Sequence, residues 1–216
     1  MSYLVKKAVG PVALDAPWDS PVWNNAVELK LEYAFERSSA HRPDTRIKMQ
    51  YDDQYIYGLF QVKDQYVKAV AEKNQDSVCY DSCVEFFVKP AGVERYFNFE
   101  MNCGGTILLY HVKNCRAHDF TVIPEEDLKT IQLFHTLPHR ITEEITEPTT
   151  WRLGFRIPIA FFQKYSNINP KLSGQTWTAN FTKCADHTSH PHWLSWQVLP
   201  KFDFHLPDSF GKLVFE

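Results

Sequence analysis

Polar residues able to bind a ligand recur at every second position of the segment 95–102. They alternate with apolar residues along Phe97, Asn98, Phe99, Glu100, Met101 and Asn102. Residues two apart point to the same side of a strand, so the polar side chains share one face. Amide and carboxylate groups of this kind hydrogen-bond hydroxyl-rich ligands. The pattern predicts either a binding surface or a solvated outer face of a sandwich, with the apolar side chains in the core.

Two glutamates, Glu85 and Glu100, lie in neighbouring predicted strands. Glycoside hydrolysis needs two carboxylates roughly 5–10 Å apart, but many β-sandwiches place glutamates that close. The chain has no nucleophile motif, phosphate-binding loop or dinucleotide-binding fingerprint. We therefore expect a non-catalytic protein.

A cluster of metal-ligand residue types occurs near the C-terminal end. It consists of Cys184, His187, His190 and His192. Imidazole and thiolate are zinc ligands, but this spacing matches no standard zinc pattern. The intervening Thr188, Ser189 and Pro191 indicate a loop. Surface histidines on a loop are the favoured interpretation.

The cysteines bear on the compartment. There are five, so at least one thiol stays unpaired within the chain, and we expect free thiols in a reducing compartment. The residues after Met1 do not resemble a secretory signal. This predicts an intracellular protein, or a secreted or periplasmic one if a signal has been lost.

Length and composition narrow the class further. The chain has 216 residues, of which 44% are hydrophobic, and a formal charge of −3. This composition supports a real core and excludes disorder as the main state. A nucleic-acid partner is not expected without a basic excess, and no apolar run is long enough to span a membrane. We expect one domain over residues 1–216.

The elements that must position these residues are mostly strands. Period-two alternation predicts strands at 27–36, 45–51, 55–62, 83–89, 95–102, 106–112, 130–136, 150–157, 176–183 and 212–215. Pro158 at a first helical position predicts a short helix over 158–165, and Gly104-Gly105 predicts a tight hairpin turn. The segment 141–149 is interpreted as a loop. The predicted fold is all-β: a two-sheet antiparallel β-sandwich, jelly-roll or immunoglobulin-like, with one short helix.

Several segments together resemble the family 9 carbohydrate-binding modules. The matching segments are Leu14–Ala26, Tyr51–Tyr57 with Val62–Asp64, Asp81–Val88, Phe97–Gly105, Trp151–Pro158 and Phe202–Leu213. They cover nearly the whole chain in the family's order. The resemblance implies a lectin-like β-sandwich that binds a sugar or the end of an oligosaccharide.

The resemblance also implies a set of ligand-binding residues. The family clamps a terminal sugar between two tryptophans, and the corresponding regions here hold Tyr80 and Phe204. Aromatic rings pack against the apolar faces of a sugar, and planar polar groups bind its hydroxyls. The predicted site is Tyr80, Glu85, Glu100, Asn102, Asn180, Trp196 and Phe204. Phe204 and Trp196 are also interpretable as core residues.

Two further implications concern a metal and a partner. Structural calcium is implied at the opening motif, where Asp15 and Asp19 are the candidate ligands, although Ala16 stands where the family has glycine. A separately encoded glycoside hydrolase is the implied protein partner.

Two other functions stay open at this stage. A related sandwich group carries haem in redox proteins, and Met101 with His205 or His187 is the conceivable axial pair. A sandwich that binds a protein is the third interpretation.

Overall fold

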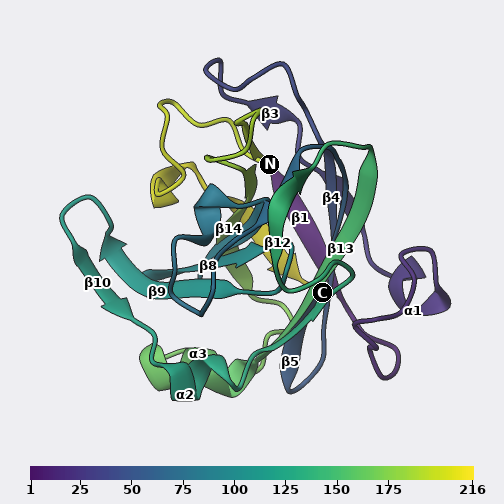
Figure 1. Cartoon of the computed structure of the whole chain (residues 1–216). Helices are drawn as coiled ribbons and strands as arrows, with labels where there is room; N and C mark the ends of the chain where they lie inside the picture. Colours follow the sequence, from purple (N-terminus) through teal and green to yellow (C-terminus); the bar gives the residue numbers. More distant parts are fainter.

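The computed structural model describes the whole chain from Met1 to Glu216 and is built mainly of β-strands in two layers (Figure 1). One layer has the order β10-β9-β8-β7-β14-β16. Its strands are β7 (Cys83–Lys89), β8 (Tyr96–Asn102), β9 (Ile107–Asn114), β10 (Asp119–Val122), β14 (Thr176–Cys184) and β16 (Gly211–Phe215). The other layer, in the order β4-β5-β13-β11, contains β4 (Asp44–Tyr51), β5 (Tyr55–Asp64), β13 (Thr149–Pro158) and β11 (Gln132–His135).

An additional strand, β1 (Ser2–Lys7), joins the two layers. Its residues Ser2 to Val5 pair in parallel with β16, and Lys6 and Lys7 pair in parallel with β4. The neighbouring strands within each layer are antiparallel. The predicted sandwich is therefore confirmed, whereas its fully antiparallel pairing is corrected at β1.

Aromatic side chains hold the two layers together. Phe86 of β7 stacks on Phe155 of β13, with ring centroids 5.5 Å apart. Phe60 of β5 meets Phe181 of β14 edge-on at 6.3 Å. All four rings are fully buried, and burial of a phenylalanine side chain contributes roughly 1.5–3 kcal/mol to stability. The alternation along the strands sends these rings into the core and leaves the next residues on the outer faces.

Helices are short and lie in the connections. They are α1 (Pro21–Asn24), α2 (Glu125–Leu128) and α3 (Ile159–Tyr165), with single 3₁₀ turns at η1 (Val78–Tyr80) and η2 (Pro207–Ser209). The predicted helix is α3; it begins at Ile159, so Pro158 stands at the N-cap position, one residue before the predicted first helical position. Three short helices occur where one was expected. The other two have only four residues each, which is too short to give a periodic pattern.

Two segments differ from the predicted elements. The alternating segment 27–36 divides into β2 (Glu28–Lys30), which pairs with β4, and β3 (Tyr33–Ala34), which pairs with β15 (Trp193–Ser195). The chain crosses from one layer to the other between β2 and β3, so one strand cannot continue. The segment 141–149 is not all loop, because β12 (Ile141–Ile145) pairs with β6 (Val67–Ala69) in a separate two-stranded sheet.

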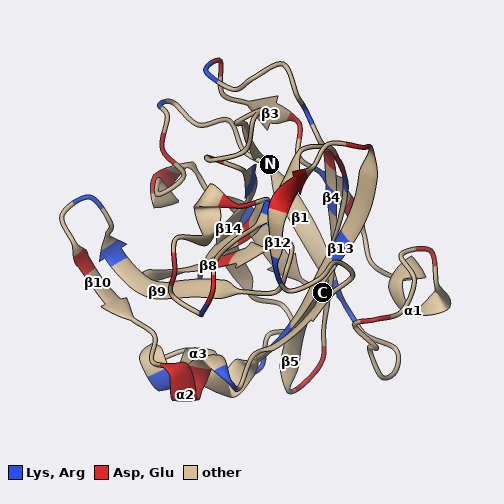
Figure 2. Cartoon of the chain, in the orientation of Figure 1, with Lys and Arg blue, Asp and Glu red and all other residues tan.

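Acidic and basic residues are interspersed over the elements (Figure 2). None of the helices combines the length and apolar character that crossing a bilayer requires. All five cysteines are free thiols, as the sequence predicts.

Candidate functional site

A pocket of about 250 Å³ opens on the outer face of the β7–β8–β14 region. Its floor is formed by strand residues, and its walls come from η1, the β9–β10 turn, β15 and the segment before η2. The lining residues are Phe35, Cys79, Glu85, Phe87, Glu100, Arg116, Cys184, Asp186, Trp193, Phe202, Asp203, Phe204 and His205. Pockets for drug-sized ligands are roughly 300–1,000 Å³, so this one fits a smaller molecule.

Strand alternation places the floor residues. Along β7, Val84 and Phe86 point into the core and Glu85 points outward. Along β8, Phe99 points into the core and Glu100 points outward. The polar face that the sequence predicts on β8 is therefore confirmed. Of the two interpretations, the solvated outer face is wrong, because the loops that form the walls cover it: Glu100 is 6% exposed.

Glu85 and Glu100 lie directly opposite each other on neighbouring antiparallel strands. Thr182 Oγ1 and Cys184 Sγ donate hydrogen bonds to Glu85, the second over 3.4 Å. Glu100 Oε1 accepts a hydrogen bond of 2.8 Å from Asn98 Nδ2. Burial raises the pKa of Glu85 to about 7, and burial together with the charge of Glu85 raises the pKa of Glu100 well above its usual range.

Four aromatic side chains form one wall of the pocket: Phe35, Trp193, Phe202 and Phe204. Phe202 packs edge-on against Phe35 at 4.9 Å and against Trp193 at 5.0 Å between ring centroids. The Arg37 guanidinium lies 4.2 Å from the Phe202 ring. Phe202 is 42% exposed, so this wall offers apolar ring surface to a ligand.

The remaining polar groups of the pocket are already paired. Arg116 Nε donates to Asp203 Oδ2 over 3.0 Å, and the two side chains form an ion pair. The Trp193 indole donates a hydrogen bond of 2.7 Å to Asp186 Oδ1. These contacts hold the wall segments against one another.

Three of the predicted ligand-binding residues line this pocket: Glu85, Glu100 and Phe204. Asn102 shares their strand face but is fully buried below the hairpin turn. Its amide nitrogen donates a hydrogen bond of 2.8 Å to Asp81, and its amide oxygen accepts hydrogen bonds from the backbone N–H groups of Gly104 and Thr106. Asn102 thus holds the β8–β9 turn, and its position does not support the predicted contact with a ligand.

The other predicted residues lie elsewhere. Asn180 is fully buried, and its Oδ1 accepts a hydrogen bond of 3.1 Å from the backbone N–H of Gln197. Trp196 is 4% exposed and packs in the core against Tyr3 and Phe181. Its position does not support the prediction of a stacking platform; the alternative core interpretation describes it. Tyr80 is exposed but stacks on His187 at 3.8 Å, outside the pocket lining.

Sequence reasoning missed four lining rings, Trp193, Phe202, Phe35 and Phe87. Alternation around β15 contained the signal for the first, since residues two apart share a face: Leu194 and Trp196 are buried, whereas Trp193 is partly exposed. Phe202 stands two residues before Phe204 in the closing motif. Nothing in the sequence near Phe35 indicates its place at the pocket.

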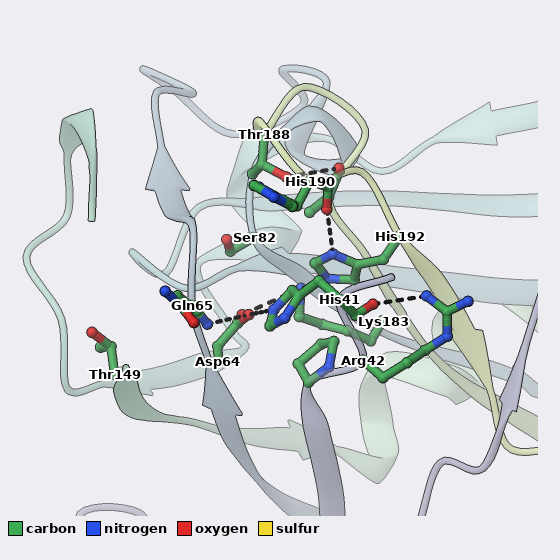
Figure 3. Close-up of polar contacts among 12 residues, drawn as sticks. His41, Arg42, Asp64, Gln65, Ser82, Thr149, Lys183, Thr188, His190 and His192 are labelled. Atoms are coloured by element: carbon green, nitrogen blue, oxygen red, sulfur yellow. Dashed lines mark hydrogen bonds and ion pairs between the residues drawn. The ribbon is translucent and has the colours of Figure 1, made fainter. Parts of the chain in front are cut away.

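A second cluster of charged groups includes Lys183 of β14, whose side chain is buried on the opposite face of that strand from Glu85's neighbours Thr182 and Cys184. Figure 3 shows Lys183 with His41, Asp64 and His192. Lys183 Nζ is 2.7 Å from His192 Nε2 and 3.5 Å from Asp64 Oδ2, and all three side chains are buried. Asp64 also contacts His41 at 2.8 Å and accepts 3.1 Å from the Trp151 indole. Burial opposes ionisation of Asp64, but the Lys183 charge and the His41 hydrogen bond hold its pKa below the usual range.

This second cluster corrects the surface interpretation for His192, whereas His187 is exposed as expected. His192 is fully buried rather than on the surface, and burial followed by the Lys183 charge lowers its pKa to about 3. His187 stacks on Tyr80 and His190 on Tyr66, so the residues of the hypothetical zinc set lie in different surroundings. Ligand atoms of His41, Asp64 and His192 do gather within 4.8 Å. The Lys183 ammonium already occupies the position of a cation there.

Other metal sites have weaker support. Ligand atoms of Cys83, Glu85 and Cys184 also lie within 4.8 Å of one another, but burial raises the pKa of Cys83 to about 12, which keeps that thiol protonated. Asp15 and Asp19 are exposed and belong to neither group of clustered ligand atoms. Calcium takes six to eight oxygen ligands, so its binding at these two residues stays a prediction.

The haem interpretation finds no support in the positions of its residues. Met101 is buried in the core between the layers. His205 lies on the outer side, where its Nδ1 is 2.9 Å from the Tyr96 hydroxyl, and His187 lies against Tyr80. A methionine in the core and histidines outside the sheet cannot ligate one haem.

The fold and the pocket place this protein in the class of β-sandwiches that carry an aromatic and acidic pocket on one outer face. The sequence model of carbohydrate-binding family 9 matches residues 24–215, and the chain belongs to this family. A comparison with curated protein sequences finds no match.

Solved structures agree with the family. A protein from Bacteroides uniformis that is proposed to bind carbohydrate is 30% identical, with a TM-score of 0.85, and the match covers 100% of this chain and 99% of that one. A family 9 module from Caldicellulosiruptor kristjanssonii in complex with glucose is 12% identical, with a TM-score of 0.68 and coverage of 100% and 96%. The same organism's family 9 module in complex with cellotriose is 14% identical, with a TM-score of 0.68 and coverage of 100% and 94%.

Proposed function

We propose that this carbohydrate-binding module holds a single sugar or the end of an oligosaccharide in the pocket beside Glu85 and Glu100. The observation that carries the proposal is the pairing of a ring wall with a polar floor inside one small pocket. A sugar ring has apolar faces and hydroxylated edges, so it needs both kinds of surface. The glucose and cellotriose complexes of family members support ligands of this size.

Each part of the pocket has a role in this proposal. Trp193 and Phe202 present ring surface to the face of the sugar. Glu85 and Glu100 accept hydrogen bonds from groups at its edge. The Arg116–Asp203 pair anchors the segment that carries Phe204, which keeps the wall in place before the ligand arrives.

The module is proposed to be non-catalytic. A glycosidase nucleophile must be ionised, yet no cation pairs with Glu85 or Glu100, since Arg116 pairs with Asp203 and Lys183 with Asp64. An accessory role beside a separately encoded glycoside hydrolase is consistent with a module that binds without cleaving. Incubation with cellotriose is expected to release no shorter sugar.

Calorimetry with a sugar panel tests the site through two tryptophans. Trp193→Ala is expected to weaken sugar binding roughly 10-fold or more with a small change in stability, because its ring lines the pocket. Trp193→Phe, which keeps a ring but loses the hydrogen bond to Asp186, should fall between. Trp196→Ala should instead cost roughly 3–5 kcal/mol of folding stability, as expected for a core ring. Unchanged affinity in Trp193→Ala would exclude this pocket as the site.

A further inference from the structure

The floor of the pocket brings together two carboxyl groups, Glu85 and Glu100, that form no ion pair with a basic side chain. Glu85 and Glu100 face each other across two antiparallel strands, a position in which like charges destabilise the sheet. The pocket lining contains two further carboxylates, Asp186 and Asp203, and a single basic side chain, Arg116. That guanidinium is taken up by Asp203.

One oxygen in this floor has no protein partner. Glu100 is 6% exposed, and Asn98 donates to its Oε1. Its Oε2 makes no hydrogen bond within the protein, and the residue lines the pocket. Both oxygens of Glu85 already accept hydrogen bonds, from Thr182 and Cys184. An acceptor left without a protein partner at the surface of a pocket is open to a donor on a ligand, which replaces water there.

We propose that the ligand of this pocket is an amino sugar, whose protonated amine sits against Glu85 and Glu100 while its ring packs on Trp193 and Phe202. This inference rests on the proposed sugar-binding function and specifies the sugar. An ammonium has three donors and a positive charge, which match two facing carboxylates better than a neutral hydroxyl does. Charge-assisted hydrogen bonds are about twice as strong as neutral ones.

The same geometry predicts a proton release. Burial and mutual repulsion favour protonation of this glutamate pair in the free protein, as its raised pKa values indicate. An ammonium seated beside the pair stabilises the ionised forms, so its arrival expels a proton into the buffer. A neutral sugar provides no charge to drive that release.

The test is calorimetry, in the presence of a chelator, with glucosamine, glucose and N-acetylglucosamine. N-acetylglucosamine keeps the ring and the nitrogen but cannot carry the charge. Glucosamine is expected to bind roughly 10- to 100-fold more tightly than the other two, with the difference reduced by added salt. Repeating the titration in two buffers of different ionisation enthalpy should show proton release for glucosamine alone.

Variants localise the effect. Glu100→Gln should remove most of the preference for glucosamine while leaving glucose binding measurable. Glu126→Gln, an exposed glutamate on α2, is the matched control and should behave as wild type. Thermal unfolding of each variant checks that it folds.

The outcomes separate the two proposals. Equal binding of glucose and glucosamine, or a preference that survives Glu100→Gln, overturns the amino-sugar inference and leaves the sugar-binding function standing. Failure of glucosamine to bind also overturns it, whatever the neutral sugars do. Binding of no sugar in the panel, cellotriose included, rejects the proposed function as well.

Discussion

Consecutive residues of β14 enter two clusters of buried charge that are built in opposite ways. Thr182 and Cys184 point outward and donate hydrogen bonds to Glu85 at the pocket floor. Lys183, between them, points inward and contacts Asp64 and His192. The inner cluster balances its charges, and the outer one gathers carboxylates without a cation.

The difference indicates what each cluster is for. Buried charges are tolerated when they are paired and fully hydrogen-bonded, and the inner cluster meets that condition with Trp151 and His41 in addition to Lys183. Burial raises the pKa of both outer glutamates and so disfavours their ionised forms, and Glu100 keeps an acceptor at the pocket. Stability explains the inner cluster, whereas the lack of an ion pair in the outer one supports the ligand-binding role proposed for it.

Removing the inner cation should have the largest effect on folding. Lys183→Met leaves Asp64 buried without its partner, and the expected loss is about 3–5 kcal/mol of unfolding free energy. Urea denaturation at neutral pH measures it. The double variant Asp64→Asn with Lys183→Met should recover much of the loss, because no unpaired charge remains. A loss below about 1 kcal/mol in the single variant would contradict a balanced ion cluster.

Removing the charge of Glu85 from the outer pair should increase the free energy of unfolding at high pH rather than decrease it. Because the pKa of Glu85 is raised to about 7, its contribution to stability is present at low pH and is lost as the pH rises through that value. Glu85→Gln is therefore expected to be more stable than wild type near pH 8, by on the order of 1–3 kcal/mol. The difference should disappear toward roughly pH 4–5, below which the glutamate is protonated in both states.

The pH series of urea denaturation needs one control. Glu126→Gln removes an exposed carboxylate and should follow the wild-type curve at every pH. A Glu85→Gln variant that is less stable than wild type at high pH would show that the pair is stabilised in a way its hydrogen bonds do not explain.

Local pattern predicted most of the strands. The hairpin of β4 and β5 and the strands β7, β8 and β14 lie within a few residues of the predicted segments, because each has one core face and a clear alternation. Strand β1 was missed since its parallel pairing with both layers is a property of the assembled sheets. The alternation over 27–36 continues across a change of layer, which no local pattern records.

The site was predictable only where a residue's face decides its role. Glu85, Glu100 and Phe204 reach the pocket from the positions that the family motifs indicate. Trp193 was missed and Trp196 chosen because the two positions lie on opposite faces and the motif alone does not say which face is open. Asn102 has an amide that could bind a ligand, yet both of its polar atoms already form hydrogen bonds with Asp81 and with the backbone of the β8–β9 turn.

The smallest effect is expected at Tyr80, where the sequence and the geometry of the pocket disagree. Its ring is 42% exposed and stacks on His187 rather than lining the pocket. Tyr80→Ala should change the unfolding free energy by about 0.5 kcal/mol or less and leave sugar affinity within about twofold of wild type. Calorimetry beside Trp193→Ala makes the comparison direct. A loss of affinity equal to that of Trp193→Ala would extend the site from the pocket to η1, where the family's first tryptophan would stand.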